Sequence, residues 1–266
     1  MPIFTSVPIV VFDQESFHAI DEILTGYAFD IHNEMGRYLD ERLYQAEMAA
    51  RLQDQKLASV REMKITVTLD DFTKFYYVDV FIRGGVIVEI KTAETLTAAH
   101  RAQVLNYLYL CGLHHATLLN FRTARVQHEF VSTHLTPALR REVSWDLNTW
   151  KPLFPGCKTL YCILGRALAD WGSGLDPTLY RDAITHFLGG EAKVIREVEI
   201  ASAHGIIGKQ KVHALAPDVG FSLTASVHHP EVVQEHHRRF LQHTPLRAIQ
   251  WVNLNRQVVS LHTLMR

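Results

Sequence analysis

The sequence predicts an α/β fold arranged as two successive domains of similar layout. Its 266 residues are 47% hydrophobic and 21% charged, a composition typical of a globular chain long enough for two modest cores. Apolar, β-branched and aromatic runs at 76–82 and 86–91 flank a Gly-Gly pair, which predicts a β-hairpin. The second half repeats the order and spacing of the apolar segments of the first, which indicates two copies of one layout.

Two local patterns support the expected elements of the first half. Asp40 is a helix cap candidate, and Glu41 in the next position favours the first turn of a helix. The run 86–91 is apolar on both faces, as in a buried strand. We expect helices near Ser16–Met35, Asp40–Gln55 and Thr95–Cys111, and strands near Lys64–Leu69, Phe75–Ile82, Val86–Lys91, Ala116–Phe121 and Arg125–Val131.

Prolines divide the chain near its middle. They stand at positions 137, 152 and 155, which predicts a linker over 135–156. The expected domains are therefore 1–134 and 157–266.

Three ionisable residues, Asp79, Glu89 and Lys91, interrupt the apolar hairpin. Buried charges are costly unless they are paired or bound to metal, so their presence requires a reason. Glu89 and Lys91 are two residues apart in a strand and share one face of the sheet.

The length of the hairpin loop decides which residue lies opposite Asp79. A two-residue turn at the glycine pair would pair Asp79 with Ile90, on the other face from Glu89. A three-residue loop over 83–85, with Gly85 left-handed, would pair Asp79 with Glu89. Two carboxylates about 5 Å apart at Cβ destabilise a sheet unless a cation lies between them, so this register indicates a divalent-metal site.

These residues resemble the signature of the PD-(D/E)xK nuclease superfamily, in which Asp79 is followed by the tract Glu89-Ile90-Lys91. Downstream, Gln103 and Tyr107 are similar to the Q-x-x-x-Y helix of RecB-like members. Upstream, the segment 31–44 resembles the GxxExxY proteins, a bacterial and archaeal branch of that superfamily. The expected αβββαβ order is that of a restriction-endonuclease-like core.

The resemblance implies an Mg²⁺- or Mn²⁺-dependent nuclease that hydrolyses phosphodiester bonds, with DNA expected as substrate rather than RNA. It implies metal binding by Glu41, Asp79 and Glu89, charge stabilisation or water orientation by Lys91, and positioning roles for Gln103 and Tyr107. Tyr38 stands where the family has its second glycine and alters the turn before Glu41. The alternative is a catalytically silent nuclease-fold protein that serves as a nucleic-acid-binding or assembly module.

Each candidate also has a purely structural interpretation. Asp79 and Lys91 could form a cross-strand ion pair, and Glu41 could serve only the helix N-terminus. Gln103 could be a surface residue and Tyr107 a core residue. The joint pattern, in family order, favours the nuclease site.

The second half has the features of a degenerate copy of the first. The tract Leu175–Tyr180 echoes Leu39–Tyr44, and one constant shift in numbering, which brings Val219 onto Val86, aligns the later segments without gaps. The functional residues are lost, because Pro177, Val212, Ser222, Thr224 and His236 stand where the first half has Glu41, Asp79, Glu89, Lys91 and Gln103. We therefore expect two tandem copies that form an internal pseudo-dimer, with metal ligands in the first alone.

Charge is divided unequally between the halves. Through Thr133 the chain has 12 Lys/Arg and 17 Asp/Glu, whereas the remainder has 15 and 11. Arg238, Arg239 and Arg247 lie on and after an expected helix, so we predict a nucleic-acid-binding face there. A solvated helix is the alternative interpretation.

Cysteine usage and the N-terminus suggest the compartment. Cys111, Cys157 and Cys162 lie in apolar surroundings without metal-binding spacing, which suits a reducing cytoplasm. The first residues lack the basic and apolar regions of a signal peptide, and no stretch is long enough to span a bilayer. We expect a cytoplasmic protein without a membrane partner.

Overall fold

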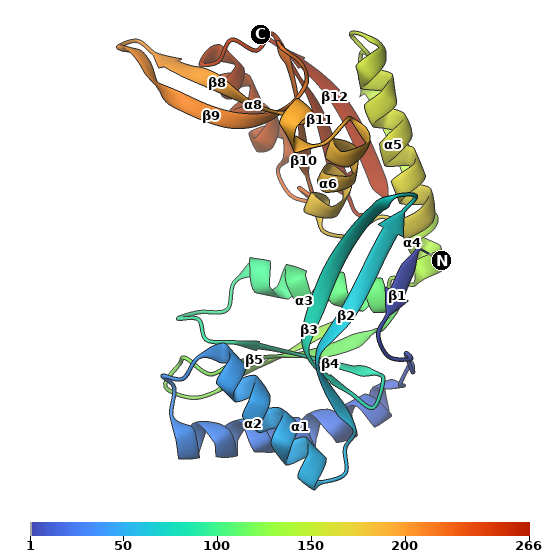
Figure 1. Ribbon diagram of the computed structural model, residues 1–266, viewed down its shortest axis with the longest axis vertical. Coiled ribbons are helices and arrows are strands. Elements are labelled where there is room, and N and C mark those ends of the chain that lie inside the picture. Colours follow the sequence, from blue (N-terminus) through green and yellow to red (C-terminus); the bar gives the residue numbers. More distant parts are fainter. Residues whose placement is uncertain (1) are drawn as a thin grey trace. The chain divides into compact units, whose positions relative to one another are not determined.

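The computed structural model describes residues 2–266, which divide into two compact units. The first unit comprises 2–68 and 73–137, and the second comprises 69–72 and 138–266. Each unit has a six-stranded mixed sheet accompanied by helices, as expected for an α/β fold (Figure 1). No helix among residues 2–266 is both long enough and apolar enough to cross a membrane.

The first unit follows the expected order of elements, with one additional strand at its start. Its sheet has the order β1-β2-β3-β4-β5-β6, in which β4 and β5 are parallel and β3–β4 and β5–β6 are antiparallel. Its elements are β1 (Ile3–Thr5), α1 (Gln14–Met35), α2 (Glu41–Asp54), β2 (Ser59–Leu69), β3 (Phe72–Ile82), β4 (Val86–Lys91), α3 (Ala98–Cys111), β5 (His115–Asn120) and β6 (Gln127–Ser132).

Helices cover both faces of this sheet (Figure 1). Asp13 caps α1 by accepting a hydrogen bond from the Ser16 N–H, and the apolar faces of α1 and α2 bury Leu24 and Met48 against Val88 of β4. Helix α3 lies on the opposite face and buries Val104. Because strand residues alternate between faces, odd-numbered residues of β4 share their face with α3.

The β3–β4 hairpin has the three-residue loop that was one of the two possibilities. Val80 pairs with Val88 and Ile82 with Val86, and the same register continued by one residue places Asp79 opposite Glu89. Asp79 therefore belongs to the face of the sheet that carries Glu89.

The expectation that Gly85 has a left-handed conformation was wrong. The left-handed residues of the loop are Arg83, with φ 50°, and Gly84, with φ 76°. A Cβ atom at Gly85 would collide with the Val10 carbonyl oxygen and the Phe12 ring. Close approach of the preceding chain, rather than backbone conformation, thus requires glycine at position 85.

One ion pair fixes α1 to the sheet. Asp21, 8% exposed, accepts a hydrogen bond from the Thr117 hydroxyl and lies 3.1 Å from Nε2 of His128 on β6. The hydrogen bond to Asp21 raises the pKa of His128. Burial opposes the charge on Asp21, but the bonds from His128 and Thr117 dominate and lower its pKa.

Replacing His128 by asparagine should make the stability of the first unit less dependent on pH. The raised pKa of His128 stabilises the folded state below its unfolded value near 6.5, and this contribution is lost as pH rises through the folded pKa. Urea unfolding followed by circular dichroism should show a deficit of about 1 kcal/mol at pH 6 that shrinks by pH 8.5. The control is His114→Asn, because His114 bonds a backbone carbonyl; an equal deficit at both pH values would contradict this account.

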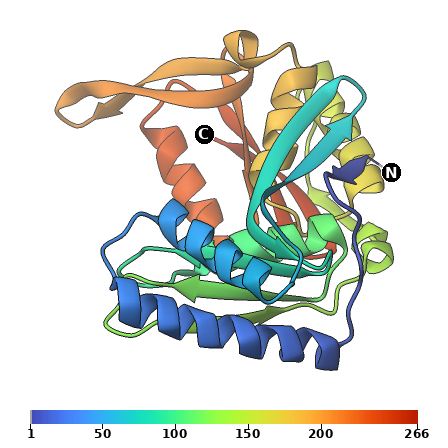
Figure 2. The same cartoon turned by 60° about the horizontal axis from the view of Figure 1, so that its bottom comes forward.

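The second unit has the sheet order β7-β12-β11-β10-β9-β8. Figure 2 shows its long β8–β9 hairpin extending beyond the helices of the same unit. Its elements are α4 (Pro137–Arg141), β7 (Ser144–Thr149), α5 (Pro155–Trp171), α6 (Pro177–Phe187), α7 (Glu191–Val194), β8 (Ile195–Ser202), β9 (Gly205–Ala216), β10 (Val219–Thr224), α8 (Pro230–Gln242), β11 (Ala248–Asn255) and β12 (Val258–Met265).

The segment 135–156, expected to be a linker, contains ordered secondary structure instead. Helix α4 and strand β7 lie within it, and β7 pairs in parallel with β12 at the edge of the second sheet. Trp145 packs its ring against Tyr161 of α5, with centroids 4.8 Å apart. Pro137 and Pro155 are the first residues of α4 and α5, and Pro152 lies between β7 and α5.

The two units share one topology. Strands β2-β3-β4-β5-β6 and β8-β9-β10-β11-β12 have the same order, and among these five strands the parallel pair is β4–β5 in one unit and β10–β11 in the other. Ile87 pairs with Ala116 and Gly220 with Ile249, so both registers obey the constant shift found in the sequence. The additional strands differ, because β1 lies beside β2 whereas β7 lies beside β12.

Two side-chain interactions recur at equivalent positions. The Tyr44 hydroxyl donates to the Gly36 carbonyl at the end of α1, and the buried Tyr180 hydroxyl donates to the Gly172 carbonyl at the end of α5.

Equivalent asparagines also hold equivalent loops. The Asn120 side chain bonds both the N–H and the carbonyl of Ala93, and Asn253 makes the same two bonds to Ser226. A shared strand order alone would not require such detailed correspondence.

Candidate active site in the first unit

Asp79 lies where β3 begins to separate from β4. Its Oδ2 atom accepts the Ile90 N–H at 2.8 Å, so a side chain replaces a backbone partner in the ladder. The side chain of Gln45, on α2, also hydrogen-bonds to Asp79. These contacts hold the carboxylate beside the strand that carries Glu89.

Glu89 is a carboxylate buried inside the sheet. It is 1% exposed, and its Oε1 atom accepts a hydrogen bond from Lys91 Nζ at 2.6 Å. Its Oε2 atom is buried without a hydrogen-bond partner among residues 2–266. An unpaired buried oxygen of this kind is costly, and a bound cation would satisfy it.

Glu41 approaches the same lysine from α2. It is the first residue of that helix, and its Oε1 atom lies 3.8 Å from Lys91 Nζ. Asp40 precedes it in the N-cap position but makes no capping hydrogen bond through its side chain.

The turn before Glu41 tolerates Tyr38. Tyr38 is 73% exposed, and its hydroxyl accepts a hydrogen bond from Arg37. The Tyr44 hydroxyl closes the turn by accepting the Leu39 N–H and donating to the Gly36 carbonyl. The tyrosine in place of the motif glycine thus does not prevent Glu41 from reaching Lys91.

Burial and mutual repulsion perturb the acids of this cluster. Burial raises the pKa of Asp79 to about 6, although the Ile90 N–H and the Lys91 ammonium oppose the shift. Burial also raises the pKa of Glu89, and the charge of Asp79 raises it further. Burial lowers the pKa of Lys91, but the carboxylate of Glu89 outweighs that effect, so the net shift is upward.

Gln103 and Tyr107 form a pair on α3. The Gln103 side-chain amide donates to the Tyr107 hydroxyl at 3.0 Å, and the Tyr107 ring meets Tyr76 edge-on. Tyr107 is 5% exposed, and its pKa is raised by burial first and by the charge of Glu89 second. Tyr107 therefore lies within electrostatic reach of the acidic cluster.

The sequence interpretation missed Gln45 and the role of Asn120. Gln45 is 4% exposed and lies four residues after Glu41, a spacing that places both on one helix face and could have identified it. Asn120 pairs with Lys91 in the β4–β5 ladder and holds the loop that follows Lys91 through Ala93. Gln45 contacts Asp79 directly, and Asn120 fixes the loop that follows Lys91.

The three arginines expected to contact nucleic acid have different environments. Arg239 pairs with Glu235 at 3.1 Å, and Arg247 pairs with Asp218 at 2.6 Å. Arg238 is exposed on α8 and has no ion-pair partner among the described residues. Of the three arginines, Arg238 is therefore the one without an ion-paired carboxylate among the described residues.

The acidic cluster suits a hard divalent cation by its chemistry. Besides burial, the charge of Glu41 raises the pKa of Asp79 and of Glu89, and carboxylate oxygen is the ligand that Mg²⁺ and Mn²⁺ prefer. Among residues 2–266 no three His, Cys, Asp or Glu side chains are already close enough to hold a metal ion. The Lys91 ammonium supplies the compensating charge next to Glu89, so metal binding would require Lys91 to move.

Residues 18–132 match a family model described as "PD-(D/E)XK nuclease superfamily". A solved structure titled "Crystal structure of SSO0001" is 15% identical over 43% of this chain and 66% of that chain, just under two thirds of it. Its TM-score of 0.29 is too low for the likeness to bear on the fold. No curated protein matches the chain significantly.

Proposed function

We propose that this protein is a divalent-metal-dependent nuclease with DNA as its preferred substrate, in keeping with the match of residues 18–132 to the model of the PD-(D/E)XK nuclease superfamily. The observation that carries the proposal is the approach of Glu41 and Glu89 to Lys91, with Asp79 bonded to the neighbouring Ile90 N–H and one Glu89 oxygen buried and unpaired. Structural ion pairs rarely leave such an oxygen unsatisfied.

Glu41, Asp79 and Glu89 would hold the Mg²⁺ or Mn²⁺ ion. When bound, the ion supplies an activated water and neutralises charge on the phosphate. The Lys91 ammonium, released from Glu89, would then stabilise the negative charge that develops during hydrolysis. Gln103 and Tyr107 would orient the substrate at the edge of this cluster.

A catalytically silent protein that binds nucleic acid is the second candidate. It is favoured by the short Lys91–Glu89 contact, which compensates the charge of Glu89 without a metal. The loss of every equivalent acid from the second unit agrees with it. On this alternative, the acidic cluster would be a structural remnant.

We also propose that the two units arose by duplication of one ancestral domain. The shared strand order, the constant shift between paired registers and the repeated Tyr–Gly and Asn–backbone bonds support a common origin. The second copy would have kept its scaffold while losing its acids.

Cleavage of a panel of nucleic acids tests the proposed function. Supercoiled plasmid, linear duplex, single-stranded DNA and RNA should be incubated with Mg²⁺, with Mn²⁺ or with EDTA. We expect cleavage of DNA with either ion and none in EDTA. If purified protein cleaves no substrate with either ion, the silent-binding candidate replaces the enzyme.

A further inference from the structure

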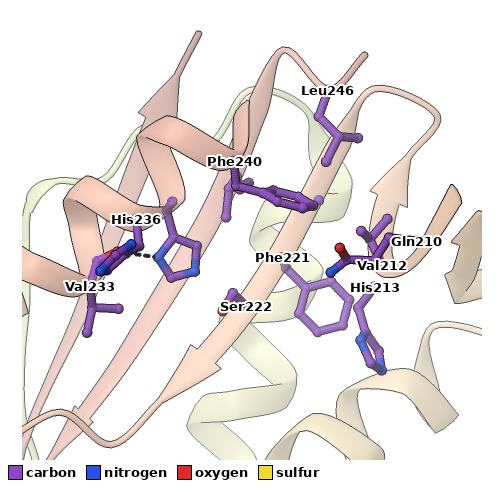
Figure 3. A pocket seen from close by; sticks show the side chains of 12 residues that line it. Gln210, Val212, His213, Phe221, Ser222, Val233, His236, Phe240 and Leu246 are labelled. Carbon is purple, nitrogen blue, oxygen red and sulfur yellow. Dashed lines mark hydrogen bonds between the residues drawn. The ribbon is translucent and has the colours of Figure 1, made fainter. Parts of the chain in front are cut away.

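The second unit contains a pocket of about 410 Å³ between α8 and the sheet (Figure 3). Its volume lies within the range of natural small-ligand sites. Side chains of β9, β10 and α8 turn toward it, and the rings of Phe221 and Phe240 form part of its wall. Leu246 and Ile249 close it from the side of β11.

This pocket occupies the position of the acidic cluster in the first unit. Under the constant shift that relates the two copies, Val212, Ser222, His236 and Phe240 correspond to Asp79, Glu89, Gln103 and Tyr107, and all four line the pocket. The second copy has therefore exchanged a charged site for an apolar, aromatic one at the same place in the fold.

A difference in helix packing creates the space. Helix α3 packs over β4, β5 and β6, whereas α8 packs chiefly over β11 and β12 and leaves β10 less covered. Leu241 is the buried residue of α8, while Phe240 and Val233 remain partly exposed beside the pocket. A side chain or ligand entering the pocket would complete the burial of these apolar groups.

The lining combines flat rings with hydrogen-bonding groups. Burial lowers the pKa of His213, so its ring is present as neutral imidazole near neutral pH. Its ring meets that of Phe221 edge-on, at 5.4 Å between centroids. Ser222 and Gln210 add a hydroxyl and an amide to the lining. Stacking surfaces beside a few polar groups suit a planar heterocycle better than an aliphatic side chain.

Helix α8, which borders the pocket, carries one cation without an ion-pair partner among the described residues. On α8, Glu235 pairs with Arg239 and Glu231 lies 3.0 Å from His229, which leaves the Arg238 cation exposed. The half of the chain after Thr133 has 15 Lys/Arg against 11 Asp/Glu. A phosphate of a strand that brought a planar base to the pocket could pair with the exposed Arg238 cation of α8.

We propose that this pocket binds an unpaired base of single-stranded nucleic acid, stacked on Phe240. The inference rests on the proposed action on nucleic acid, and it assigns substrate holding to the second unit and cleavage to the first. Single-strand-binding proteins use aromatic side chains beside basic residues in this way, without a fixed sequence preference.

Replacing Phe240 by leucine tests the pocket, because leucine keeps an apolar side chain but removes the ring. Fluorescence anisotropy with a labelled 12-nucleotide strand in EDTA should show affinity lower by about 5- to 150-fold. Duplex DNA of the same sequence should bind the variant and the wild type equally. Phe240→Tyr should bind single strands like the wild type, and so should the control Phe187→Leu on α6.

NMR signals of the histidine rings distinguish a base from an apolar side chain as the occupant of the pocket. A single-stranded oligonucleotide should shift the ring signals of His213 and His236, whereas N-acetyl-leucine amide should not. Shifts with the amide alone would show that the pocket takes an apolar peptide side chain and would overturn the proposal. Unchanged single-strand affinity in Phe240→Leu would overturn it too, whether or not the protein cleaves DNA. If Phe240→Leu lowers the affinity for single strands but the wild-type protein cleaves no nucleic acid, only the proposed nuclease activity is refuted.

Discussion

Substituting Asp79 by asparagine should lower the rate of phosphodiester cleavage by about 1,000-fold or more without unfolding the first unit. A bound metal contributes several kcal/mol of transition-state stabilisation, and asparagine removes the charge that helps to hold it. The asparagine oxygen can still accept the Ile90 N–H, so the hairpin keeps its contact. Loss of the charge also relieves repulsion on Glu89.

Single-turnover cleavage with saturating enzyme measures this effect separately from substrate binding. Asp54→Asn is the matched control, because Asp54 is exposed at the end of α2 in the same unit. A rate within a factor of three of the wild type for Asp79→Asn would remove Asp79 from the active site.

Substituting Lys91 by methionine should destabilise the first unit by about 3–5 kcal/mol at pH 8. The change strands the Glu89 carboxylate, which is 1% exposed, without its compensating cation. Glu89 has a raised pKa in the folded state, so it binds a proton more tightly there than in the unfolded chain. Stability should therefore fall as pH rises and recover toward pH 5.

Urea unfolding provides an internal control for this variant. All four tryptophans lie in the second unit, so tryptophan fluorescence follows that unit while circular dichroism follows both. The double variant Lys91→Met with Glu89→Gln should regain most of the lost stability, because no buried charge remains. A double variant as unstable as Lys91→Met alone would show that packing of the lysine stem, not charge, accounts for the loss.

The strands and helices of the first unit were largely predictable because their patterns are local. The run Val86–Lys91 was expected and observed with identical ends. The sequence left the hairpin loop open between two registers, and the structure selects the three-residue loop. In the structure, residues near Val10 pass over Gly85, a contact distant in sequence that no local pattern indicates.

The errors arose where tertiary contacts override local preference. Strand β7 is short and polar at both ends, and its pairing with β12 joins residues more than 100 positions apart, so the prolines around it suggested a linker. The loss of acids in the second half was visible in the sequence. The pocket that replaced them was not, because it depends on how α8 packs over the sheet.

The sequence indicated which side chains lie near one another but not how their charges are arranged. Asp79, Glu89, Lys91 and Glu41 do approach one another, and Gln103 does pair with Tyr107. The sequence could not show that Lys91 neutralises Glu89 in the absence of metal, nor that one oxygen of Glu89 remains unpaired. Those features follow from the depth of Glu89 in the sheet.

Titration calorimetry of Mn²⁺ into the wild type and into Glu89→Gln tests most directly whether the first unit holds a divalent cation. The wild type should bind the ion at the acidic cluster and release protons, since the raised pKa values of Asp79 and Glu89 favour protonated acids before binding. Glu89→Gln should lose that binding while its melting temperature stays the same or rises. Equal Mn²⁺ affinity and equal proton release in both proteins would contradict a metal site at Glu89.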